Sequence, residues 1–79
     1  PRTTLRFRLD QAGSADLELI DARGRRVQTL ELGPRAIGEH STVWLGTDHR
    51  GRAVASGVYY VRLRLDGRIL DARSITLVR

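Results

Sequence analysis

Alternation of apolar and polar residues is the feature that most constrains what this chain can fold into. In the stretch 58–65 the odd-numbered positions are aromatic or aliphatic, whereas Arg62 and Arg64 occupy even-numbered ones. This period of two is typical of a half-buried β-strand. The pair Asp66-Gly67 follows directly and favours a type I′ hairpin turn. Since no segment shows sustained helical periodicity, the sequence predicts an all-β fold.

Short runs of this kind, separated by turn-forming residues, recur along the whole chain. Regular spacing of short strands and turns predicts a single antiparallel β-sandwich of the immunoglobulin or fibronectin-III type over residues 1–79. We find no linker and no internal repeat. We expect about seven strands, at residues 3–9, 14–21, 26–32, 39–45, 53–56 (a short piece), 57–66 and 68–78.

The expected core gathers the inward-facing side chains around the single tryptophan. Residues 33–39 are expected to form a loop because Pro34 cannot donate to a central ladder. The uneven spacing of Val27 and Leu30 predicts a bulge or an edge strand. Gly24 is expected to take a positive φ in a tight reversal. The nine expected core residues are Phe7, Leu17, Leu19, Trp44, Tyr59, Val61, Leu63, Ile75 and Leu77.

Composition limits the function classes. The chain has 79 residues, no cysteine and a net charge of +5, and all 14 of its basic residues are arginine. The arginines are spread over the chain, which argues against a specific nucleic-acid partner, although the net charge favours anionic surfaces in general. No apolar run approaches the roughly 20 residues of a membrane span, so we expect no transmembrane segment. Because the chain opens on Pro1, we expect it to be a piece of a longer protein.

Few residues of the sequence are candidates for catalysis or metal binding. His49 lies in a turn-rich stretch without a third ligand nearby, so we expect no metal site there. Ser56 is not in a nucleophile elbow, and the sequence predicts no catalytic residue and no cofactor. Asp48 is expected to cap its own loop by accepting backbone N–H groups. Calcium binding by that loop is left open, since only one carboxylate is local.

Two phrases of the sequence carry a family resemblance that extends over nearly the whole chain. Residues 17–30 contain Asp-x-x-Gly-Arg-x-Val-x-x-Leu, and residues 44–59 contain Trp-x-Gly-x-Asp-x-x-Gly followed by Val-Ala-Ser-Gly-Val-Tyr. Together they resemble C-terminal immunoglobulin-like modules of bacterial secreted proteins. These include type IX secretion sorting domains and the immunoglobulin-like domain of the flagellar hook-capping protein. The chain departs from the pattern at Ile20 and Leu45. The ending 73–79 is similar to the tail of sorting domains, which implies that Arg79 is a natural C-terminus.

The resemblance implies a non-catalytic C-terminal module that directs secretion or surface tethering of a larger exported protein. Its partners would be secretion machinery or a cell-surface protein and the upstream domain of the same polypeptide, and its location secreted or at the cell surface. One alternative is a structural or assembly module of an extracellular appendage, such as a hook cap, that pairs through an exposed sheet edge. Another is a carbohydrate-binding accessory domain that uses Tyr60, His49 and the arginine face. The predicted partner surface comprises Tyr60, Arg62, Arg64, Arg68, Arg73 and Arg79.

Overall fold

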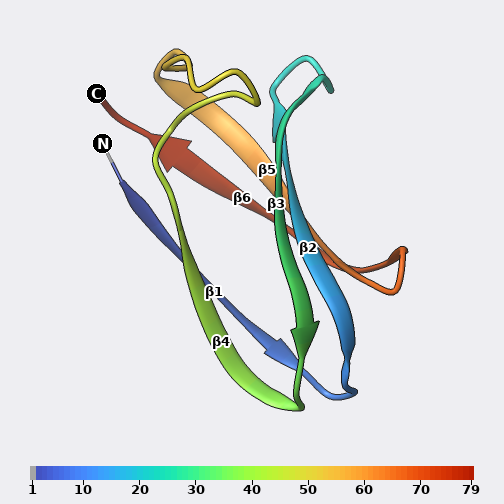
Figure 1. The fold of residues 1–79 in the computed structure, drawn as a ribbon. Helices are drawn as coiled ribbons and strands as arrows, with labels where there is room; N and C mark the ends of the chain where they lie inside the picture. Colours follow the sequence, from blue (N-terminus) through green and yellow to red (C-terminus); the bar gives the residue numbers. More distant parts are fainter. Residues whose placement is uncertain (1) are drawn as a thin grey trace.

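The computed structural model describes residues 2–79; Pro1, the first residue of the expected domain, lies outside the described residues. Six β-strands follow one another with no helix between them in this part of the chain (Figure 1). The strands are β1 (Thr3–Leu9), β2 (Gly13–Asp21), β3 (Arg26–Arg35), β4 (Gly38–Trp44), β5 (Gly57–Leu65) and β6 (Arg68–Leu77).

The strands form two sheets that pack face to face (Figure 1). One sheet has four strands in the order β3-β2-β5-β6, and the other pairs β1 with β4. Every pairing is antiparallel, so the predicted all-β antiparallel sandwich is confirmed. The expected short strand at 53–56 is wrong, because this segment pairs only through one bridge between Thr47 and Ala53. Val54 donates its N–H to Gly46 within the same loop, so no neighbouring sheet receives it.

The core is centred on Trp44, which is 1% exposed. The indole meets the ring of Tyr59 edge to face, with ring centroids 5.2 Å apart. Trp44 Nε1 donates to the carbonyl of Thr47 at 2.9 Å, and the Tyr59 hydroxyl donates to the carbonyl of Ala55 at 2.6 Å. A buried aromatic ring needs a partner for its polar atom. Both rings donate to backbone carbonyls of the loop 45–56, and these hydrogen bonds fix that loop to the core.

Most of the expected core residues are buried, and the exceptions lie on one side of the sandwich. Phe7 on β1 and Ile75 on β6 are only partly buried, although both pack against the core. Both strands are edges of their sheets, and a two-stranded sheet cannot cover a four-stranded one. The sandwich is therefore open between β1 and β6. The seven expected core residues that are buried are Leu17, Leu19, Trp44, Tyr59, Val61, Leu63 and Leu77.

Strand β3 is an edge strand with two irregularities, as the spacing of Val27 and Leu30 predicted. The loop expected at 33–39 is wrong, because β3 continues through Pro34 to Arg35. Proline removes a donor from a ladder only where that donor would be paired. At a sheet edge the missing N–H faces away from the neighbouring strand, so proline is compatible with β3.

The hairpin between β5 and β6 forms as predicted. Asp66 has φ 51° and Gly67 has φ 82°. Positive φ at both central positions defines a type I′ turn, which suits the twist of the flanking strands. The Asp66 carboxylate also accepts the N–H of Ser14 at 2.9 Å, and Asp66 N–H donates to the Ser14 carbonyl at 2.8 Å. The turn is thereby tied to the start of β2.

Candidate functional site

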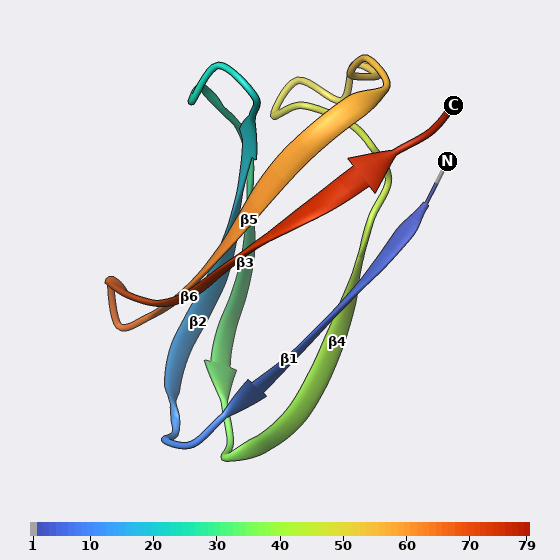
Figure 2. The ribbon, with the colours of Figure 1, turned by 180° about the vertical axis from the view of Figure 1, so that it is seen from behind.

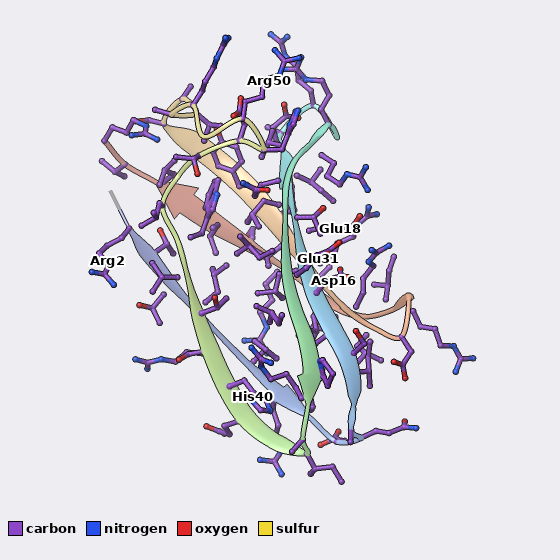
Figure 3. The ribbon with its side chains drawn as sticks, in the orientation of Figure 1. Arg2, Asp16, Glu18, Glu31, His40 and Arg50 are labelled. Carbon is purple, nitrogen blue, oxygen red and sulfur yellow. The ribbon has the colours of Figure 1, made fainter. Side chains whose placement is uncertain are left out.

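The outer face of β5 carries three of the predicted surface residues, Tyr60, Arg62 and Arg64. Two carboxylates of β2, Asp16 and Glu18 (labelled in Figure 3), lie directly opposite these arginines in the strand register. Arg62 Nη2 is 3.0 Å from Glu18 Oε1, and Arg64 Nε is 2.8 Å from Asp16 Oδ1. Opposite charges placed directly across two strands stabilise the pairing.

Glu18 is the centre of this network and is 3% exposed although it lies on the outer face. Arg26 of β3 approaches Glu18 Oε2 at 3.3 Å, and Arg64 adds a contact at 3.8 Å. A buried charge is tolerated only when it is paired and hydrogen-bonded. The arginine stems cover the carboxylate while their guanidinium groups stay near solvent. The hydrogen bond from Arg64 to Asp16 raises the pKa of Arg64. These arginines therefore stabilise the sheet as well as lining its surface.

Arg68 and Arg73 lie elsewhere on β6. Arg68 is exposed beside the hairpin turn. Arg73 stands opposite Val61 in the register, so its side chain starts on the core-facing side of the sheet. There it pairs with Asp71 at 3.0 Å, and both side chains remain largely exposed. An inward-pointing charge is a known means of discouraging uncontrolled edge pairing.

Arg79 lies near the opposite end of β6 and holds the loop 45–56. Its guanidinium donates to the carbonyls of Gly46 and Val54, and its backbone N–H donates to the Ser56 hydroxyl at 3.1 Å. The predicted surface residues thus divide among the outer face of β5, two separate positions on β6 and the loop 45–56, and do not form one continuous patch. Their role in binding a partner stays a prediction.

The open side of the sandwich forms a groove between β1 and β6, with a volume of about 800 Å³. Its floor is apolar and comes from the two central strands, chiefly Leu17, Val61 and Leu63. Phe7 lines the β1 side, and Leu70 lines the β6 side with half of its surface exposed. In Figure 2, β1 and β6 lie close where the chain ends and diverge toward the 65–69 hairpin. The free edge of β1 borders this groove.

A second hollow, of about 650 Å³, lies at the end of the sandwich where the β2–β3 turn meets the loop 45–56. Both segments lie at the top of Figure 1. Arg23, Arg25, Arg26 and His49 contribute to its lining together with apolar atoms of residues 54–59. It shares no lining residue with the groove between β1 and β6.

Two loops of the same design flank this hollow, at 21–25 and 48–52. Each reads Asp-x-Arg-Gly-Arg, a repeated pentapeptide that the sequence analysis did not single out. In each loop the aspartate Oδ1 accepts the N–H groups two and four residues later, at 2.9–3.0 Å. Gly24 and Gly51 take φ values of 86° and 80°. The predictions for Gly24 and for the capping role of Asp48 are confirmed.

The hydrogen bonds in these loops shift the acidity of both aspartates. The N–H of Arg25 lowers the pKa of Asp21 most, and the N–H of Arg52 does the same for the pKa of Asp48. Carboxylates that accept backbone N–H bonds favour their charged form. Oδ1 of Asp48 is thus occupied by two backbone amides of its own loop.

Metal-binding groups are sparse. Among residues 2–79, no cluster of three or more histidine, cysteine, aspartate or glutamate side chains has the geometry to hold a metal ion. His49 is exposed. His40 stacks on Phe7 at 5.4 Å between ring centroids and contacts the Ala36 carbonyl at 2.7 Å through Nε2. No helical stretch in the described chain has the length and apolarity of a membrane span.

Comparisons with known proteins relate this geometry to a family. The family model of the FlgD Ig-like domain matches residues 2–67. FlgD from P. aeruginosa has a similar fold, with a TM-score of 0.83 at 22% identity over 94% of this chain and 60% of that one. FlgD from Xanthomonas campestris has a TM-score of 0.77 at 27% identity over 95% of this chain and 56% of that one. A comparison with curated proteins gives no match. The immunoglobulin-like fold is thus confirmed, and the chain spans little more than half of these FlgD structures.

Proposed function

Because the chain belongs to the family of FlgD Ig-like domains, we propose that it is a non-catalytic structural module in the assembly of an extracellular bacterial appendage. The FlgD structure from X. campestris is described in terms of hook capping that is essential for flagellar assembly. This supports the assembly alternative of the sequence analysis over secretion sorting. In this proposal residues 1–79 are one domain of a larger exported polypeptide that acts at the cell surface.

The open side of the sandwich is the observation that carries the proposal. An edge strand presents unpaired N–H and C=O groups to any extended segment that lies beside it. A segment added to the free edge of β1 would point every second side chain into the groove, over Leu17 and Val61. Main-chain bonds then supply affinity, and the apolar groove supplies selectivity. The partner we propose is an extended segment of a neighbouring appendage protein with apolar residues at alternate positions.

Deletion of residues 2–79 from the polypeptide in its own bacterium tests the assembly role. We expect the shortened protein still to leave the cell, while electron microscopy shows incomplete appendages or none. Retention of the shortened protein inside the cell, with normal appendages, would instead favour the sorting interpretation.

Two neighbouring residues of β6 provide a test substitution in the groove and a matched control outside it. Leu70 lines the groove, whereas Ile69 stands opposite Arg64 on the outer face; both are more than half exposed. We expect Leu70→Glu to impair appendage assembly and Ile69→Glu to leave it unchanged, since both add one charge at an exposed apolar site. Equal effects of the two variants would refute the groove as the contact.

A further inference from the structure

The two Asp-x-Arg-Gly-Arg loops present a group of cations that no described partner neutralises. We name Arg23, Arg50 and Arg52 the arginine tip. All three are exposed, and their side chains make no ion pair or hydrogen bond with any residue in 2–79. Figure 3 places Arg50 at the end of the molecule, away from the Glu18 network. Arg25 and Arg26, which line the same hollow, are by contrast paired with Asp21 and Glu18.

The aspartates of the two loops do not pair with the side chains of the tip. Asp21 and Asp48 turn their Oδ1 atoms onto backbone N–H groups of their own loops, and Asp21 Oδ2 binds Arg25 at 3.0 Å. The ten loop residues contain four arginines and two aspartates, a net charge of +2 with His49 neutral. The aspartates shape the loops without accepting from the outward-pointing guanidinium groups.

The backbone of the two loops that carry the tip is held by hydrogen bonds before any partner binds. Within each loop the aspartate N–H donates to the fifth residue at 2.8 Å, and the glycine N–H donates back to the aspartate carbonyl at 3.0 Å. Two further bonds join the loop 48–52 to the start of β3, from His49 N–H to the Val27 carbonyl and from the Gln28 side chain to the Asp48 carbonyl, each at 2.9 Å. Preorganised loops lose less entropy on binding than mobile ones.

We propose that the arginine tip binds an acidic segment of another protein, with an apolar side chain of that segment entering the hollow beside it. Guanidinium groups recognise carboxylates through paired N–H···O bonds. The hollow of about 650 Å³ includes Val27, Val54 and the buried ring of Tyr59 in its lining, which fits an aliphatic side chain. Single-stranded nucleic acid is bound through several exposed aromatic faces on which successive bases stack, whereas the lining of this hollow exposes one aromatic ring, that of His49. This inference is independent of the groove and extends the proposed function to a second contact.

The test measures binding of a fluorescein-labelled peptide that has one leucine flanked by glutamates, by fluorescence anisotropy at low and moderate salt. The tip variant carries Arg23→Gln, Arg50→Gln and Arg52→Gln. The control variant loses the same charge elsewhere through Arg2→Gln, Arg6→Gln and Arg35→Gln, all outside the two loops and outside the hollow. We expect the tip variant to bind about tenfold more weakly, because exposed charge pairs each contribute modestly, and the control to bind within about twofold of the unaltered chain.

Four further binding measurements distinguish the acidic peptide from other ligands. A peptide with glutamines in place of glutamates should not bind, and one with alanine in place of leucine should bind more weakly. Vesicles of phosphatidylcholine and phosphatidylglycerol, and a single-stranded oligonucleotide, should bind less well than the acidic peptide. Equal losses in the tip and control variants, or stronger binding to vesicles or oligonucleotide, would overturn the proposal. Unchanged thermal unfolding of both variants shows that binding, and not folding, was altered.

Discussion

At the scale of single residues, charge in this chain serves two separate purposes. Glu18 is buried and surrounded by three guanidinium groups, so its arginines belong to the sheet. Asp48 instead serves its own loop, and leaves Arg50 and Arg52 facing solvent. The net positive charge does not reveal which arginines stabilise the sheet and which face solvent, because that depends on which carboxylate each arginine can reach.

Replacing Glu18 with glutamine should destabilise the fold. Among residues 2–79, Glu18 is the carboxylate that pairs with both Arg26 and Arg62, so the change leaves these two cations close together across the sheet. We expect a loss of about 1–3 kcal/mol, since part of each guanidinium is solvated. Urea unfolding followed by the fluorescence of Trp44 measures it. Glu39→Gln, at an exposed site on β4, removes the same charge and should change stability by less than about 0.5 kcal/mol. A similar loss in both variants would contradict the assigned role of Glu18.

The pKa of Asp48 gives a pH-dependent prediction. Its folded pKa lies below the ordinary value of 3.8, so the contribution of the charged carboxylate is present above that pH and is lost as pH falls through the folded pKa. The stability difference between the unaltered chain and Asp48→Asn should be largest at neutral pH and shrink below about pH 4. Thermal unfolding across this range tests the sign. Asp10→Asn, at a 94% exposed side chain, serves as the control.

At the scale of elements, the sequence predicts strands best where one face is buried and the period is unbroken. Strand β5 has alternate residues buried along its length, and its boundary and turn were predicted almost to the residue. Strand β3 is different, since its bulges break the alternation and its edge position permits Pro34. The segment 53–56 resembles a strand locally, yet its donors bond within its own loop. Whether a segment pairs is decided by neighbours that the local pattern does not reveal.

The candidate sites were harder to predict from the sequence than the strands. The outward direction of Tyr60, Arg62 and Arg64 follows from alternation alone, but the burial of Glu18 requires the register between β2 and β5. The groove depends on how two sheets of unequal width overlap, which no local pattern specifies. The two Asp-x-Arg-Gly-Arg loops were visible in the sequence as a repeated pentapeptide, and only their adjacency in space gives the repeat a meaning.

The shared geometry of these two loops predicts a shared response to substitution. Gly51 has φ 80° with no atom within 4 Å of an added Cβ, so the cost of a side chain there is conformational. Gly51→Ala should cost about 1 kcal/mol, and Gly51→Asn less, because asparagine tolerates the left-handed region better than alanine. Gly24→Ala and Gly24→Asn should show the same order. Urea midpoints measure all four variants. If alanine proves no worse than asparagine at both positions, the left-handed backbone is not what requires glycine.

At the scale of the whole molecule, the fold combines fully paired central strands with an open groove between β1 and β6. Strands β2 and β5 are paired on both edges, whereas β1 has a partner only in β4. The open side and the loop end use different residues, so the molecule offers two contacts that a partner could use together or separately. A structural module that links several proteins needs such separate surfaces more than it needs one deep pocket.

Hydrogen exchange of the isolated chain tests whether that side is open in solution. In an antiparallel pair only alternate residues bond to the neighbouring strand, so alternate amides of β1 should exchange rapidly while those of β2 and β5 exchange slowly. Strand β3, the edge on the far side of the larger sheet, supplies the internal control, since its outward amides should also exchange rapidly. Addition of a partner strand should then protect the fast amides of β1 and leave those of β3 unchanged. Slow exchange at every amide of β1 in a chain that is monomeric by light scattering would mean that its edge is already paired, and strand addition at the groove would have to be abandoned.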